Sequence, residues 1–267
     1  VGVSRPVVKH SFIVKNCSEI PLIVRKAFHI ATTGRPGPVV IDIPKDTTDP
    51  DILGNYEFPQ RITMRSYNPV IKGNSKQITK AVKQIFAATK PIFYVGGGAI
   101  QGNASKELKE MMAFLRAPIT NTLMGLGAFP GTNKQFLGML GMHGTYQANM
   151  AMHEADLIVA IGARFDDRVT NNPDKFCPRA KIIHIDIDPA SISKIINVDT
   201  PIVGDVEAIL SAMNKTVESV WSELAEEKQK AFLENLELWW SQIDTWRKAH
   251  GLDHSLVVDE SKRILPQ

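Results

Sequence analysis

Apolar residues recur at helical spacing in three segments between residues 75 and 215, and short apolar runs separate these segments. Recurrence at i, i+3, i+4 and i+7 predicts helices with one buried face, and unbroken apolar runs predict strands buried on both faces. Alternation of the two predicts an α/β fold, a doubly wound parallel sheet with its ligand at the carboxyl ends of the strands. The helical positions are Ile78, Ala81, Val82, Ile85 and Phe86, then Leu108, Met111, Met112 and Leu115, then Val206, Ile209, Leu210 and Met213. The six strands are expected at PIFYV, PITNTL, the run ending in MLG, ADLIVAIG, AKIIHIDID and PIVG.

The pattern before residue 49 predicts a separate strand, helix and strand. These are SRPVVKHSFIV, then SEIPLIVRKAFHIATTG with Ser18 as a possible N-cap, then PGPVVIDIPKD. Residues 49–72 are rich in Pro, Gly, Asn and Asp and lack a sustained period, which is typical of a linker. The main domain is expected over residues 73–248, and residues 249–267 are expected to lead into another element.

The segment from residue 215 to about residue 248 has a helical period and carries four tryptophans among charged residues. A mostly solvated helix with an aromatic stripe is typical of a packing element. We therefore expect Trp221, Trp239, Trp240 and Trp246 to pack against the domain core.

Charge and cysteine content narrow the class of partner. Lys and Arg total 31 against 28 Asp and Glu, and no run of five like charges occurs, so a small molecule is favoured over nucleic acid or a membrane surface. Cys17 and Cys177 form no C-x-x-C pair, which disfavours a disulfide framework or a structural zinc site. A reducing, cytoplasmic setting is expected. The sequence contains no stretch of eighteen apolar residues that would predict a membrane span.

The segment VGGGAIQGN places Gly96, Gly97 and Gly98 at the end of an apolar strand. Glycines here let the oxygens of an anion reach backbone N–H groups at the start of a helix. They equally suit a tight turn that packs helix against strand, and the segment alone does not separate the two. It is not a G-x-G-x-x-G motif, so a standard nicotinamide site is not supported.

A second strand end, MLGMHGTYQANMA, carries Gly141, Met142, His143 and Gly144. The thioether of Met142 would pack well on a flat ring. A lone histidine is more often structural than catalytic, and His143 has no serine or cysteine partner near it in sequence.

The segment IGARFDDRVT places Gly162 at the end of a strand, followed by Arg164, Asp166, Asp167 and Arg168. Arginine binds phosphate or carboxylate through a fork of donors, and a carboxylate beside it can orient that fork. The alternative is a surface ion-pair cluster that contributes little energy. Position directly after a buried strand favours the functional interpretation.

Acidic residues follow the next two strands. Asp186 and Asp188 stand where nucleotide-binding sheets commonly place a carboxylate for ribose or adenine donors. Gly204 and Asp205 end the last strand, and Asp205 is better explained as a helix cap. Together, the Gly, Arg and Asp residues at these strand ends predict a binding site for a long ligand with phosphates and a sugar, such as a dinucleotide.

The chain resembles the acetolactate synthase family, the thiamine-diphosphate enzymes also called acetohydroxyacid synthases, over essentially its whole length. The motifs are TGRPGPVVIDIPKD, YVGGGAI, LGMHGTYQANMAM, GARFDDRVT and HIDIDPASI. The combination of LGMHG with ARFDDRVT is specific to the FAD-containing biosynthetic branch. The resemblance implies that residues 1–48 end a pyrimidine-binding domain, that residues 73–248 form a six-stranded, Rossmann-like FAD-binding middle domain, and that residues 249–267 lead into a diphosphate-binding domain.

The resemblance also implies site residues. Those implied to bind FAD are Arg35, Gly96, Gly97, Gly98, Thr122, Leu123, Met142, His143, Gly144, Gly162, Ala163, Arg164, Asp166, Asp186, Ile187, Asp188, Gly204 and Asp205. Those implied for the substrate channel are Lys45, Asp167 and Arg168. On this reading the glycine triplet makes room for the FAD chain.

The activity implied by the resemblance is that of a longer protein. It joins the two-carbon unit of decarboxylated pyruvate to pyruvate or 2-oxobutyrate, using thiamine diphosphate and Mg²⁺, on the route to valine, leucine and isoleucine. FAD carries out no net redox in it, and the enzyme is a homodimer or tetramer with a possible regulatory small subunit. The family's catalytic glutamate falls before Val1 and its metal motif after Gln267, and GDV at 204–206 is not that motif. We therefore expect a fragment without catalytic residues, inactive by itself.

Two other classes, and an oxidase of the same superfamily, remain open. A non-catalytic FAD-binding module, as in electron-transfer flavoproteins, would share the sheet. A pyruvate oxidase would use FAD as a true electron acceptor. A sirtuin-like deacylase has a related sheet but needs a set of zinc-binding cysteines that this sequence lacks, so it ranks last.

Overall fold

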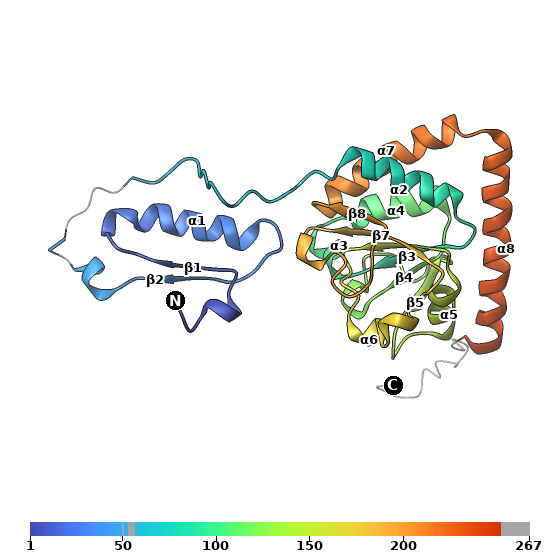
Figure 1. The fold of residues 1–267 in the computed structure, drawn as a ribbon, viewed down its shortest axis with the longest axis horizontal. Helices are drawn as coiled ribbons and strands as arrows, with labels where there is room; N and C mark the ends of the chain where they lie inside the picture. Colours follow the sequence, from blue (N-terminus) through green and yellow to red (C-terminus); the bar gives the residue numbers. More distant parts are fainter. Residues whose placement is uncertain (50, 53–56, 252–267) are drawn as a thin grey trace, which may run out of the picture.

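The computed structural model describes residues 1–49, 51–52 and 57–251 and contains a six-stranded parallel sheet (Figure 1). Its strands run in the order β5-β4-β3-β6-β7-β8. The order reverses between β3 and β6, and in such sheets ligands bind at the carboxyl ends beside this point. The predicted doubly wound α/β fold is therefore confirmed. The strands are β3 (Pro91–Val95), β4 (Ile119–Asn121), β5 (Phe136–Met139), β6 (Leu157–Ile161), β7 (Lys181–Asp186) and β8 (Thr200–Val203).

Helices cover both faces of this sheet (Figure 1), with α7 in contact with both α2 and α4, and α5 in contact with α8. All thirteen apolar positions predicted from helical spacing are buried. Asn74 starts α2 by accepting hydrogen bonds from the amides of Lys76 and Gln77. The helices are α2 (Ser75–Ala87), α3 (Gly97–Gln101), α4 (Ser105–Leu115), α5 (Tyr146–Glu154), α6 (Asp167–Thr170), α7 (Val206–Glu223) and α8 (Glu226–His250), with a 3₁₀ turn η4 at Leu123–Gly125.

The N-terminal unit consists of two parallel strands and one helix, β1 (His10–Ile13), α1 (Ile20–Thr32) and β2 (Val39–Asp42), with β1 paired to β2. The first strand is shorter than predicted because Arg5–Val7 form a 3₁₀ turn, η1. Ser18 as N-cap was wrong, because it lies inside the 3₁₀ turn η2 (Cys17–Glu19) that precedes α1. A third turn, η3 (Lys45–Thr48), follows β2.

Residues 57–72, which connect this unit to the sheet domain, contain no helix or strand. The predicted lead into a further domain, residues 249–267, lies outside the described residues from position 252 onward. In the described part of the chain, no helix has the length and apolar character needed to cross a bilayer.

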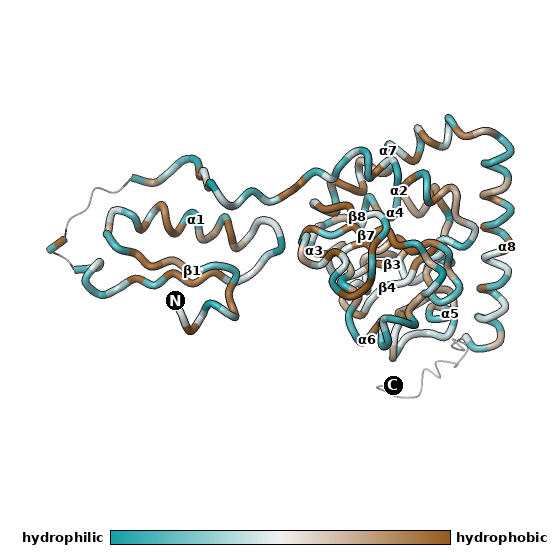
Figure 2. The backbone as a smooth tube through the Cα atoms, viewed as in Figure 1, coloured by the Kyte–Doolittle hydropathy of each residue, from teal (hydrophilic) through white to brown (hydrophobic). Residues whose placement is uncertain are grey.

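The segment after residue 215 forms two helices, because α7 ends at Glu223 and α8 begins at Glu226. Gln229 stabilises the break by donating through Nε2 to the carbonyls of Trp221 (2.7 Å) and Leu224 (3.1 Å). Trp239 is fully buried and donates through Nε1 to the carbonyl of Pro91 at 3.1 Å. Trp221, Trp240 and Trp246 are partly buried against the same core, so the packing role predicted for the tryptophans is confirmed. Figure 2 shows polar and apolar positions mixed along α8, which runs beside the sheet.

Two leucines of α8, one buried and one exposed, allow the contribution of packing to stability to be measured apart from that of helix propensity. Leu236 is 5% exposed and Leu238 is 70% exposed. We expect Leu236→Ala to lower the free energy of unfolding by about 2–5 kcal/mol, since it removes buried methyl groups and leaves a cavity. Leu238→Ala, the matched control, should change it by no more than about 0.5 kcal/mol. Urea unfolding followed by tryptophan fluorescence measures both, and equal losses would contradict the packing of α8.

Candidate functional site

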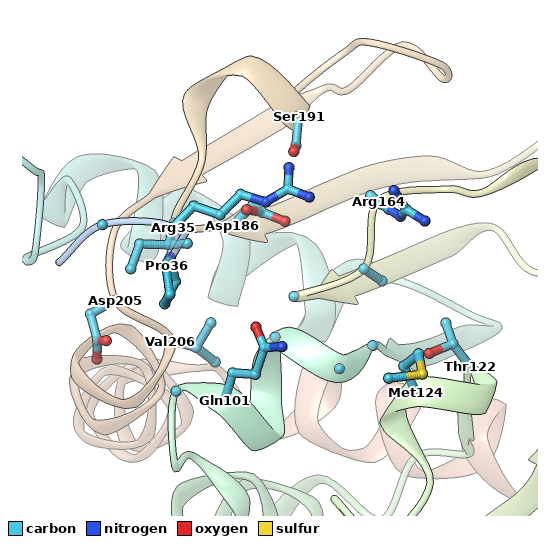
Figure 3. Close-up of a pocket in the computed structure, with 18 of the residues that line it drawn as sticks. Arg35, Pro36, Gln101, Thr122, Met124, Arg164, Asp186, Ser191, Asp205 and Val206 are labelled. Atoms are coloured by element: carbon cyan, nitrogen blue, oxygen red, sulfur yellow. The ribbon is translucent and has the colours of Figure 1, made fainter. Parts of the chain in front are cut away.

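A cavity of about 790 Å³ opens at the carboxyl ends of the strands, beside the point where the strand order reverses (Figure 3). A volume in this range suits an organic ligand of substantial size. The cavity brings together most of the residues singled out from the sequence. These are Arg35, Gly96, Gly97, Gly98, Thr122, Leu123, Gly162, Ala163, Arg164, Asp166, Arg168, Asp186, Ile187 and Asp205.

The glycine triplet lines the cavity, but the protein itself requires two of its members to be glycine. A Cβ on Gly96 would lie 2.2 Å from the carbonyl oxygen of Gly162, and one on Gly98 would lie 2.7 Å from the Cα of Gly162. The amides of Gly96 and Gly98 donate to the carbonyls of Ile161 (2.9 Å) and Gly162 (3.0 Å). The packing alternative therefore explains Gly96 and Gly98, whose α-carbons meet the backbone at the end of β6.

The end of β4 forms the adjoining wall through the turn η4. Thr122 Oγ1 accepts a hydrogen bond from the amide of Gly125 at 3.0 Å, and the buried Asn121 donates through Nδ2 to the carbonyl of Gly125 at 2.7 Å. These bonds fix the turn and leave Leu123 and Met124 exposed at the rim. Apolar contact with a ligand is thus available at this end.

The end of β6 carries the charged part of the site. Arg164 pairs with Asp166 at 2.8 Å, and Asp166 also accepts from the amide of Arg168, which starts α6. Contacts with the Asp167 side chain and with the Arg168 amide, assisted by Arg164, hold the pKa of Asp166 below its usual value. Arg164 and Arg168 line the cavity, whereas Asp167 does not.

Within this charged segment, Phe165 has a buried ring and an unusual backbone conformation. Phe165 has φ of 55°, in the left-handed region, and its ring centroid lies 5.4 Å from that of Tyr94 and 5.2 Å from that of His184. Conformations of this kind are costly for a bulky residue and cluster at functional sites. The Tyr94 hydroxyl is buried without a hydrogen-bond partner among the described residues, and burial raises the pKa of this phenol.

The ends of β7 and β8 supply carboxylates. Asp186 Oδ1 accepts from the amide of Asp188 at 2.8 Å and lines the cavity. Asp188 lines a neighbouring groove, where it accepts from Arg35 at 3.0 Å and caps the 3₁₀ turn η6 (Pro189–Ser191). Asp205 caps α7 by accepting from the amide of Ala208, so the predicted cap is confirmed.

Five of the residues predicted for the site lie outside this cavity's lining, besides Asp167 and Asp188. Met142 is 63% exposed, and its amide donates to the carbonyl of Arg168. A Cβ on Gly144 would lie 2.5 Å from the Leu140 carbonyl carbon, so this glycine serves a tight turn. Lys45 lies in η3, at the end of the N-terminal unit that points away from the sheet domain (Figure 1). The roles of Met142, His143, Gly144, Gly204 and Lys45 remain predictions.

The structure also adds lining residues that sequence reasoning missed. Pro69, Val70 and Ile71 enter from the connecting segment because the Asp205 amide donates to the Ile71 carbonyl at 2.8 Å. Their local sequence carries no motif that predicts this contact. Gln101 faces the cavity from α3 (Figure 3), one turn beyond the glycine triplet, and proximity to that motif was the available signal. The others are Thr32, Thr33, Gly34, Pro36, Tyr94, Gly102, Met124, Val169, Ser191 and Val206.

Among the described residues, no three or more His, Cys, Asp or Glu side chains lie close enough together to hold a metal ion. The candidate site consists of a glycine-rich turn, the three arginines Arg35, Arg164 and Arg168, carboxylates and an apolar rim.

The chain is similar to thiamine pyrophosphate enzymes, both by a family match and by individual relatives. Residues 78–213 match the family described as thiamine pyrophosphate enzyme, central domain. The acetolactate synthase large subunit of Haemophilus influenzae is 55% identical over 253 residues, which cover 95% of this chain and 43% of that protein. Acetolactate synthase isozyme 3 large subunit of Escherichia coli is 50% identical over 267 residues, covering 100% of this chain and 45% of that protein. The chain thus spans less than half the length of these relatives.

The close contact between Gly98 and Gly162 can be tested by adding one methyl group. Gly98→Ala gains up to about 1 kcal/mol of helix propensity, but its Cβ meets backbone at 2.7 Å. Overpacking of this kind costs about 1–3 kcal/mol, so we expect a net loss in the free energy of unfolding. The control is Gly131→Ala, whose Cβ would meet only the Phe136 ring at 3.8 Å. A Gly98→Ala protein as stable in urea as the control would contradict the contact.

The ion pair of Arg35 and Asp188 predicts a pH dependence. Partial burial raises the pKa of Asp188, but hydrogen bonds from Arg35 and the Ala190 amide outweigh it, and the pKa lies below its usual value. Because the folded pKa is lowered, the contribution of Asp188 to stability is present above about pH 4 and is lost as pH falls through the folded pKa. The difference in unfolding free energy between wild type and Asp188→Asn should therefore shrink below about pH 4. A difference that is the same at pH 3 and pH 7 would count against the pair.

Proposed function

The chain belongs to the thiamine pyrophosphate enzyme family, and from this premise we propose that it forms the FAD-binding central part of an acetolactate synthase large subunit. The single observation that carries the proposal is the cavity of about 790 Å³ that joins the ends of β3, β4, β6, β7 and β8. Its position at the reversal of strand order is where sheets of this kind bind dinucleotides.

The lining matches the parts of a dinucleotide. The side chains of Arg35 and Arg164 are 57% and 67% exposed, so both guanidinium groups are accessible to a diphosphate. Asp186 provides a carboxylate of the type that accepts ribose hydroxyls. The exposed Leu123 and Met124 provide an apolar rim for a flat ring. The remaining predicted FAD ligands, including Met142 and His143, belong to the same proposal.

The proposed role of this site is to bind and orient FAD. When bound, FAD would supply an isoalloxazine ring that shapes the neighbouring active site without net electron transfer. The turn at Gly96–Gly98 would let the FAD chain pass close to the backbone, while the amides of Gly96 and Gly98 keep their hydrogen bonds to Ile161 and Gly162. The paired carboxylate of Asp166 would keep the Arg164 guanidinium in orientation.

The activity proposed for the whole protein is acetolactate synthesis. It would condense two pyruvates, or pyruvate and 2-oxobutyrate, with loss of CO₂, using thiamine diphosphate and Mg²⁺ as further cofactors. We propose the substrate channel at Lys45, Asp167 and Arg168, a homodimer or tetramer with a possible regulatory small subunit, and a cytoplasmic location.

FAD binding by the 267-residue chain tests the proposal directly. Wild type should retain a protein-shifted flavin absorption band after incubation with FAD and desalting. Arg164→Ala should raise the FAD dissociation constant about tenfold or more, the scale of a lost hydrogen bond to a charged group. Asp174→Ala, a control in η5 (Pro173–Lys175) away from the cavity lining, should leave it unchanged.

Flavin-fluorescence titration of the three proteins separates the outcomes. Equal dissociation constants for Arg164→Ala and Asp174→Ala would remove Arg164 from the site. A wild-type chain that stays colourless and shows no titration would contradict FAD binding by this cavity. A bound flavin that is readily reduced and reoxidised would instead favour a redox module over acetolactate synthesis.

A further inference from the structure

Lys9 forms a hydrogen-bonded centre outside the cavity. Its Nζ donates to the carbonyls of Ile30 (2.5 Å) and Thr33 (2.6 Å) and to the Tyr67 hydroxyl (2.9 Å). An ammonium group has three donors, so these three acceptors use its full capacity. Ile30 and Thr33 stand at the carboxyl end of α1, where carbonyls lack helical partners and a positive charge is favourable.

Tyr67 extends the network from the connecting segment. Its hydroxyl donates to the Thr33 carbonyl at 2.8 Å and lies 3.1 Å from Thr33 Oγ1. Lys9 Nζ also lies 5.1 Å from the centroid of the Tyr67 ring, and the His29 ring meets that ring edge to face at 5.8 Å. Three segments far apart in sequence are thus joined at one point.

Two of these segments continue directly into the cavity wall. Thr33 precedes Gly34, Arg35 and Pro36, all of which line the cavity, and Tyr67 precedes Pro69–Ile71, which line it from the connecting segment. Gly34, which follows Thr33, has φ of +57°, and a Cβ on it would lie 3.2 Å from the Tyr67 hydroxyl. The network therefore sits behind the part of the wall that lies outside the six-stranded sheet domain.

We propose that Lys9 and Tyr67 are positioning residues that hold the Thr33–Pro36 turn and the Pro69–Ile71 segment in place, so that Arg35 is presented to a bound dinucleotide. The inference rests on the proposed function for its ligand. Lys9 and Tyr67 line the neighbouring groove, which also contains Asp188, and do not line the cavity. We therefore expect their effect on binding to pass through Arg35 and the wall. The Arg35–Asp188 pair, at 3.0 Å, then orients the side chain at the far end of the turn.

The binding test is a double-mutant cycle with FAD as the probe. Lys9→Met keeps the aliphatic stem and removes the three donors, and we expect it to raise the FAD dissociation constant about five- to tenfold. In an Arg35→Ala background the same change should have less than about a twofold effect, because residues that act through a shared partner are not additive. Tyr67→Phe should show the same pattern with a smaller effect. Lys15→Met, an exposed lysine of the same unit, is the matched control and should bind as wild type.

Tryptophan fluorescence distinguishes a specific effect on FAD binding from a global loss of structure. All four lie in α7 and α8, so their fluorescence reports unfolding of the sheet domain. We expect the same urea midpoint for Lys9→Met and wild type. Additive effects of Lys9→Met and Arg35→Ala on FAD binding, or wild-type affinity in Lys9→Met, would overturn the positioning role.

Hydrogen exchange tests the network without any ligand. In Lys9→Met the amides of Thr33, Gly37 and Asp205, which bond to the carbonyls of His29, Ala31 and Ile71, should exchange at least tenfold faster, while those of β3 and β6 stay unchanged. Unchanged exchange at these three amides would overturn the inference whatever FAD does. If they respond while wild type binds no FAD, the proposed function fails and the network stands as the support of the wall.

Discussion

The site depends on a close backbone contact at the reversal of strand order. The turn after β3 and the end of β6 approach so closely that a Cβ at Gly96, Gly98 or Gly162 would overlap backbone atoms of the facing segment. Two backbone hydrogen bonds join the segments: the Gly96 amide donates to the Ile161 carbonyl at 2.9 Å, and the Gly98 amide donates to the Gly162 carbonyl at 3.0 Å. Because β3 and β6 are adjacent and in register, with Val95 opposite Ile161, the contact aligns the two ends from which the rest of the cavity spreads.

The contact between β3 and β6 forms the floor of the cavity, and a different set of contacts holds the wall contributed by residues outside the sheet domain. It comes from the end of α1 and from the connecting segment, which share side-chain hydrogen bonds around Lys9 and Tyr67 and a backbone bond from Asp205 to Ile71. Long polar side chains can be released at lower cost than interlocked backbone. The cavity therefore combines a rigid floor, which belongs to the sheet domain, with a wall that is kept in place by a few separable contacts.

The sequence predicted the sheet domain well because helical spacing and unbroken apolar runs report directly on burial. It failed at Ser18, where a 3₁₀ turn rather than a side-chain cap precedes the helix. The charged residues of the site were recognised because they follow buried strands. Pro69–Ile71 and Tyr67 were not, since their roles arise from contacts with residues distant in sequence, such as Asp205 and Lys9, that no local pattern records.

Two of the three arginines that line the cavity illustrate why ion pairs orient this site without stabilising it much. Arg35 and Arg164 each hold a carboxylate, at 3.0 and 2.8 Å, yet both side chains are more than half exposed. Exposed pairs contribute at most about 1 kcal/mol, so an anionic ligand can share or replace these partners at little cost. The carboxylates limit the directions that each guanidinium fork adopts before binding, which reduces the entropy lost when the fork closes on a ligand. Shape is thus maintained by backbone packing, and the charges remain available for recognition.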